Sequence, residues 1–146
     1  MVADRALTPA DAAVALRSFP RRFRSVFARP DDDDRVDPDE VARRAGTDGR
    51  TAVDHLSAAI SVADAVREAT RQRTPAPLPT AAPDDGRGLP QLLDELDAAA
   101  IAAADAVDAV STDDWSIEGL LGLVQDAVGL VADHLRAAQR VISEVA

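Results

Sequence analysis

The chain has 146 residues, of which 47% are hydrophobic and only 3% aromatic, and it carries a net charge of −10. This length suits one domain with a single core, and the absence of cysteine excludes disulfides, a thiolate nucleophile and a zinc site built on sulfur. A field this negative repels polyphosphates, so nucleic acid is not an expected partner. All sixteen basic residues are Arg, which is typical of a GC-rich genome; adaptation to high salt is the alternative source of the acidic excess.

No targeting or membrane segment is predicted. The first seven residues lack the apolar core of a signal peptide, and no stretch reaches about 18 uninterrupted apolar residues. The most apolar window, residues 117–135, is interrupted by charged and polar side chains. We therefore predict a cytoplasmic protein with no membrane partner.

The first helix is predicted to begin after Thr8, a favourable N-cap residue, with Pro9 at the first helical position and Asp11 in the first turn. Large apolar residues then recur at spacings of three and four and form one stripe: Leu16, Phe19, Phe23 and Val26. Pro20 lies inside this pattern. Because proline lacks a backbone donor, we expect it to kink the helix or to restart it.

A short helix and a second long helix are predicted next. Residues 28–37 form a polar connector, and Asp37-Pro38 signals a short helix that closes at Gly46. A long helix then runs from about Thr51 to Arg73. Its apolar side chains at helical spacing are predicted to face inward: Val53, Leu56, Ile60, Ala63 and Val66.

Residues 74–90 hold five of the nine prolines, which predicts a long non-helical connection. A third long helix is predicted over 90–110, and a last one over 117–145 after the break at 111–116. The side chains predicted to face inward are Leu92, Leu93, Leu96, Ile101 and Val107, then Leu120, Val124, Val128, Val131, Leu135, Ala138 and Ile142. The fold class is therefore all-α: an antiparallel four-helix bundle, in one domain over residues 1–146.

Three segments resemble the DinB-like superfamily of bacterial four-helix bundles. Residues 16–24 (Leu-Arg-Ser-Phe-Pro-Arg-Arg-Phe-Arg) are similar to the first-helix signature of an actinobacterial subgroup. Residues 51–56 (Thr-Ala-Val-Asp-His-Leu) resemble the family's entry to helix two, and residues 133–142 resemble its histidine-rich last helix. Asp114-Trp115 ahead of that helix also fits. Relatives include mycothiol- and bacillithiol-dependent transferases and maleylpyruvate isomerases.

The resemblance implies a divalent metal held by three histidines, one from helix two and two from the last helix, four residues apart. Residues at i and i+4 share a helical face, so two imidazoles can meet one ion. This chain has only two histidines, so that site cannot form. In one register the ligand positions fall on Ala58, Gly129 and Asp133, and Arg50 replaces the family's tryptophan.

A second register retains more of the site. Here His55 stands for the ligand of helix two and His134 for the second ligand of the last helix, while Leu130 replaces the first. Asp133 would add an oxygen. The residual metal candidates are then His55, Asp133 and His134. The alternative interpretation, which the sequence favours, is that both histidines are ordinary, partly exposed residues.

Other groups of residues have simpler interpretations. Arg17, Arg21 and Arg24 share one helical face and form either an anion site or, as we favour, a solvated face paired with acids. The run 31–34 of four Asp lacks the spacing of a calcium loop and is interpreted as an acidic connector. Trp115 is predicted to anchor its loop onto the last helix rather than to line a ligand pocket.

Three functions remain open from the sequence. The leading hypothesis is a DinB-like bundle without a catalytic site or cofactor, which binds a small apolar ligand or another protein. The alternative is a transferase or isomerase that uses a divalent metal such as Zn or Ni and a thiol such as mycothiol, with the residual candidates as ligands. The third is a structural homodimer that packs through the small residues from Ala98 to Ala104.

Overall fold

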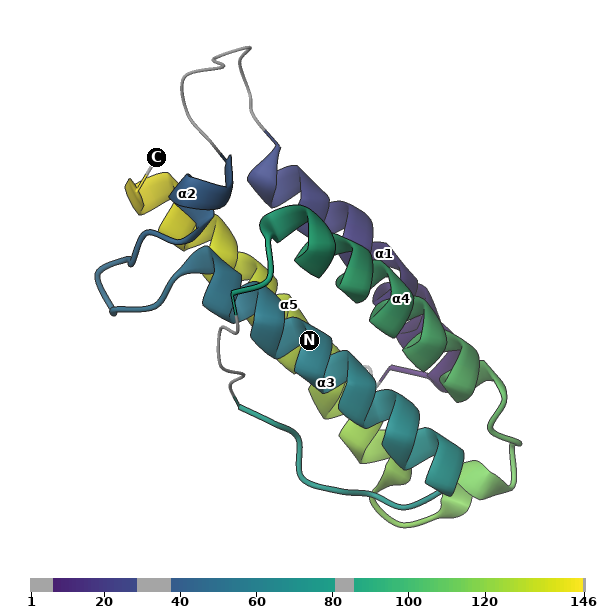
Figure 1. The fold of residues 1–146 in the computed structure, drawn as a ribbon. Coiled ribbons are helices and arrows are strands. Elements are labelled where there is room, and N and C mark those ends of the chain that lie inside the picture. The colour runs from purple at the N-terminus through teal and green to yellow at the C-terminus, as the bar shows by residue number, and fades with distance from the viewer. Residues whose placement is uncertain (1–6, 29–37, 81–85, 146) are drawn as a thin grey trace, which may run out of the picture.

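A computed structural model describes residues 7–28, 38–80 and 86–145 (Figure 1). Within these residues the protein is helical, and no strand is formed. Four long helices lie side by side, which confirms the predicted all-α class. The helices are α1 (Pro9–Phe27), α2 (Pro38–Ala42), α3 (Ala52–Gln72), α4 (Leu89–Asp108), the short 3₁₀ helix η1 (Asp114–Ser116) and α5 (Leu120–Val145).

Helix α1 begins where the sequence predicts. The hydroxyl of Thr8 accepts a hydrogen bond from the backbone N–H of Asp11, at 3.1 Å, so that one of the unpaired donors of the first turn is satisfied. The helix continues through Pro20 as a single element. Of the two expected outcomes, a kink or a restart, the restart is therefore wrong. Buried apolar side chains on both sides of Pro20, such as Phe19 and Phe23, pack in the core and favour one continuous helix.

The loop after α2 leads into a strongly capped α3. Helix α2 ends at Ala42 rather than at Gly46, which instead lies in a turn closed by a hydrogen bond to the carbonyl of Arg50. Thr51 and Asp54 then form a capping box, in which each side chain accepts from the other residue's backbone N–H. This reciprocal pair fixes the first turn of α3.

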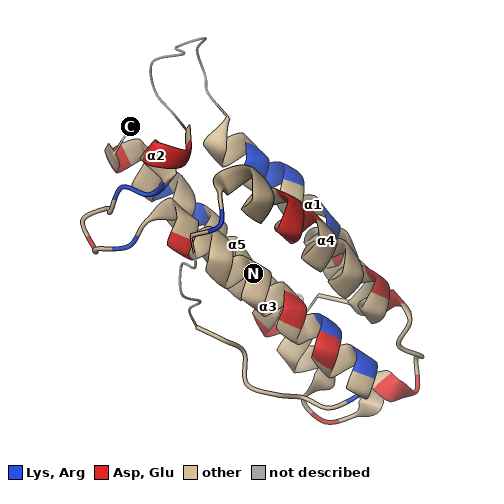
Figure 2. Cartoon of the chain, in the orientation of Figure 1, with Lys and Arg blue, Asp and Glu red and all other residues tan. Residues whose placement is uncertain are grey.

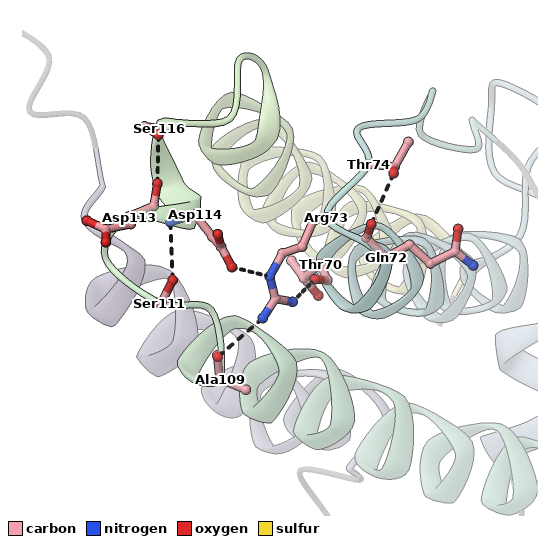
Figure 3. A network of polar contacts seen from close by, with 9 residues as sticks. All are labelled: Thr70, Gln72, Arg73, Thr74, Ala109, Ser111, Asp113, Asp114 and Ser116. Atoms are coloured by element: carbon pink, nitrogen blue, oxygen red, sulfur yellow. Dashed lines mark hydrogen bonds and ion pairs between the residues drawn. The ribbon is translucent and has the colours of Figure 1, made fainter.

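Arg73 ends α3 and ties three elements together (Figure 3). It adopts the left-handed conformation, with φ of 53°. Its guanidinium donates to the carboxylate of Asp114 at 3.0 Å and to the carbonyls of Thr70 and, at 3.4 Å, Ala109. The C-terminal ends of α3 and α4 therefore meet beside η1.

The last helix begins later than predicted, at Leu120 instead of 117. Residues 114–116 form η1, and Gly119 has a φ of +84°, which an α-helix does not permit. Trp115 is half-buried and packs against the core, as expected for an anchor of this loop.

The core lies between the four long helices. Helix α1 packs against α4 and α5, and α3 packs against the same two helices. The long connection between α3 and α4, described over 74–80 and 86–88, runs back along the outside of the bundle (Figure 1). The largest fully buried side chains include Phe19, Phe23 and Leu56. Ile101 is 49% exposed, so its predicted inward orientation is wrong.

None of the described helices combines the length and the apolar character that a membrane crossing requires.

Candidate functional site

The two histidines of the chain meet in the core, although they are 79 residues apart in sequence. His55 lies in the first turn of α3 and His134 in the second half of α5. The loop before α3 lies against the end of α5, where the backbone N–H of Thr47 donates to the carboxylate of Glu144 at 3.0 Å. Only 5% of His55 and 7% of His134 is exposed. The expectation of two partly exposed residues is therefore wrong.

The rings face each other through their Nδ1 atoms, which are 3.0 Å apart. The ring centroids are 5.3 Å apart, and the ring planes are inclined by 45°. This distance is that of a hydrogen bond. A hydrogen bond between two Nδ1 atoms requires that one nitrogen carries a proton and the other presents a lone pair.

The tautomers follow from this contact. When both rings are neutral, the donor ring has its proton on Nδ1 and a bare Nε2, whereas the acceptor ring has its proton on Nε2. Both Nε2 atoms are buried and find no hydrogen-bond partner among the described residues. One ring therefore leaves an unpaired acceptor in the core and the other leaves an unpaired donor, at a cost of about 1–3 kcal/mol for each.

Burial also disfavours the charged state of both rings. Desolvation lowers the pKa of His55 below its ordinary value, and the positive charge of Arg50 adds to this effect. Desolvation likewise lowers the pKa of His134, and the neighbouring His55 opposes a second proton. Both rings are therefore neutral at pH 7.

The third residual candidate does not join the pair. The side chain of Asp133 is 67% exposed and is paired with Arg136, one turn further along α5. Leu130, at the position that the resemblance assigns to the missing histidine, is half-buried. In the other register Gly129 and Asp133 are both exposed, while Ala58 is buried. The second register therefore brings together its two histidines, but not its third candidate, Asp133.

A catalytic zinc site needs more ligands than the two histidines supply. Such a site has three protein ligands and an open position. In the described part of the chain no three His, Cys, Asp or Glu side chains are close enough together to hold an ion. The residues present therefore do not fit the three-histidine site that the resemblance implies.

An open groove of about 650 Å³ lies elsewhere on the bundle. The connection after α3 forms one wall, and the start of α5 forms the other. It is lined mainly by apolar or small residues: Pro75, Ala76, Pro77, Leu78, Gly119, Gly122, Leu123 and Asp126. Asp126 is eight residues from His134, about 12 Å along the helix axis, so the groove is separate from the histidine pair. The sequence analysis did not predict this groove. The available signal was the pair of prolines at 75 and 77 and the pair of glycines at 119 and 122, which contribute to its two walls.

Two of the three arginines on this face of α1, Arg17 and Arg24, are paired with acids, as favoured from the sequence. Arg17 and Arg24 each bind two aspartates of α4, at 2.5–2.9 Å, and all the partners are at least one-third exposed. The aspartate run 31–34 lies outside the described residues.

Comparisons of this chain with protein-family models, with curated proteins and with solved structures find no match.

Proposed function

We propose that this protein is a DinB-like bundle that acts by binding rather than by metal-dependent catalysis. The arrangement of the helices supports the fold part of this proposal. Arg17 binds the end of α4 and Arg24 its beginning, so α1 and α4 run in opposite directions. The start of α3 lies near the end of α5, where Thr47 binds Glu144, and the end of α3 lies near the start of α5, where Arg73 binds Asp114, so these two helices have the same relation. The long connection leaves α3 and α4 parallel, because Arg73 joins their C-terminal ends.

One observation carries the functional part: the imidazoles that a metal would need bind each other. Each Nδ1 is engaged by the opposite ring at 3.0 Å. No third ligand lies with them in the described residues. The pair then serves as a tie between α3 and α5 in the core, and the alternative of a thiol-dependent metalloenzyme lacks the ligand set on which its chemistry depends.

A metal titration tests this proposal. Purified protein is dialysed, analysed for metals and titrated with Zn²⁺ and with Ni²⁺ while the melting temperature is followed. We expect no stoichiometric metal and no rise of the melting temperature, because an ion that binds only the folded state stabilises it by mass action. One equivalent of metal with a higher melting temperature, both lost in the His55→Leu/His134→Leu variant, would support the metalloenzyme instead.

The apolar groove is the part of the surface that we assign to a small apolar ligand. Gly122 lines the groove, and a Cβ added there meets no atom within 4 Å. Gly122→Leu therefore fills the groove without a clash, and we expect it to weaken the fluorescence enhancement of the apolar dye 1-anilinonaphthalene-8-sulfonate at least threefold. Gly129→Leu is the matched control, because Gly129 is equally open on the same helix but lies outside the groove.

Both variants replace a helical glycine, so each gains about 0.5–1 kcal/mol of helix stability. A difference between them in dye binding then reports the groove and not the stability. Equal dye binding by the two variants would contradict a ligand site at this position.

A further inference from the structure

The outer face of α1 and α4 carries the exposed large hydrophobic side chains of the described chain. These are Val14 on α1, which is 68% exposed, and Ile101 on α4, which is 49% exposed. Ile101 has small neighbours, since Ala98 is exposed and Ala102 half-buried on the same helix. Another helix can therefore approach α4 closely at this position.

The charges around Ile101 are neutralised within the chain. Asp97 and Asp105 lie one helical turn before and after it, and each is bound by an arginine of α1: Asp97 by Arg24 at 2.5 Å and Asp105 by Arg17 at 2.9 Å. Figure 2 shows the basic residues of α1 beside the acidic residues of α4. In a chain with a net charge of −10, the arginines of α1 offset most of the negative charge of the aspartates on this face. An apolar centre within an Arg-containing charged rim is the usual anatomy of a protein interface.

The face is also self-complementary. Its positive stripe (Arg17, Arg21 and Arg24) runs along α1, and its negative stripe (Asp94, Asp97, Asp105 and Asp108) runs beside it along α4. A two-fold axis that lies in the interface and parallel to the helices places each positive stripe over the negative stripe of the other copy. A two-fold interface uses the same patch twice and needs this property.

We propose that two copies of this chain associate through the α1–α4 face. Ile101 lies at the level of α1 between Arg17 and Arg24, because these residues bind Asp105 and Asp97 on either side of it. In the dimer, Ile101 of each copy therefore packs on the turn of α1 around Arg21 of the other copy, where the aliphatic stem of the arginine offers apolar surface. This inference is independent of the groove and of the histidine pair.

Sedimentation velocity from 1 to 200 µM tests the proposal. We expect wild-type protein to dimerise and Ile101→Glu to raise the dimer dissociation constant at least tenfold, since the substitution removes the apolar side chain at the centre of the interface and requires a carboxylate to lose its water there. Arg21→Glu should have the same effect. Gln139→Glu is the charge-matched control, because it adds one negative charge at an exposed position on α5. It should leave the dimer intact.

Circular dichroism confirms that each variant is folded. A wild-type chain that stays monomeric up to 200 µM overturns the proposal. A dimer that Ile101→Glu and Arg21→Glu weaken no more than Gln139→Glu does places the interface elsewhere and overturns it as well.

Discussion

Replacing His134 alone by Leu is expected to destabilise the protein by about 1–3 kcal/mol, because the substitution leaves His55 buried with both ring nitrogens unpaired. His55→Leu should have an effect of similar size for the same reason. The double variant His55→Leu/His134→Leu removes both polar rings from the core at once. It should therefore be no less stable than either single variant, since two buried polar partners can be exchanged for apolar groups at little cost.

Urea unfolding of the four proteins closes a double-mutant cycle. We expect the destabilisation of the double variant to be smaller than the sum of the two single effects by about 0.5–3 kcal/mol, the range found for residues in contact. Strict additivity would show that the two rings do not interact in solution and would remove the tie between α3 and α5.

The caps and the helical periodicity were sufficient to predict most of the helices. Thr8 and Thr51 cap α1 and α3 with the expected hydrogen bonds, because a cap is a local interaction among neighbours in sequence. The predicted start of α5 at residue 117 was wrong, because residues 114–116 form a 3₁₀ turn and Gly119, with φ of +84°, interrupts the helical conformation. Gly119 lies two residues after the predicted start, and a glycine at such a position indicates that the helix can begin later.

Ile101 shows where hydrophobicity misleads. The buried stripe of α4 continues from Leu96 through Ala99, Ala100, Ala103 and Ala104 to Val107, so small residues occupy the positions that face the core. Ile101 is off this stripe and was assigned inward by its type rather than by its spacing. The position of Ile101 on the helix, outside the buried stripe, predicts the exposure that the structure shows.

The histidine pair could be predicted only in part. His134 lies at helical spacing with the buried residues Ala127, Val131, Ala138 and Val141, so its burial was readable from the sequence. Helix α3 is buried over a wide arc of its surface, and His55 lies within this arc. Their contact depends on how α3 and α5 pack, and no local pattern encodes a contact between residues 79 positions apart.

The stability of the protein should fall as the pH is lowered below about 6.5, and the histidine pair should be the reason. Desolvation lowers the pKa of both rings in the folded state, whereas in the unfolded chain each titrates near 6.5. The unfolded state then binds more protons than the folded state in this window. The contribution of the neutral pair is fully present above pH 6.5 and is lost as the pH falls from 6.5 toward the folded pKa values.

The charges around the pair act in both directions. The positive charges of Arg50 and Arg140 oppose protonation of His55, and Arg50 also opposes that of His134. The carboxylates of Asp48 and Asp54 favour protonation of His55, and Asp133 favours that of His134. Desolvation outweighs these opposing charges. Once one ring is protonated, its contact with the other at 3.0 Å opposes a second proton.

Urea unfolding at half-unit steps between pH 5.5 and 8 measures this effect. We expect the free energy of unfolding of the wild-type protein to decrease toward pH 5.5, and that of His55→Leu/His134→Leu to change much less. Burial raises the pKa of Asp64 above 3.8, whereas a hydrogen bond from the backbone N–H of Arg50 lowers the pKa of Asp48. Both carboxyl groups are present in both proteins, so the comparison between the two pH profiles isolates the histidines. Parallel pH profiles for the two proteins would mean that the rings are accessible to solvent and titrate as they do in the unfolded chain.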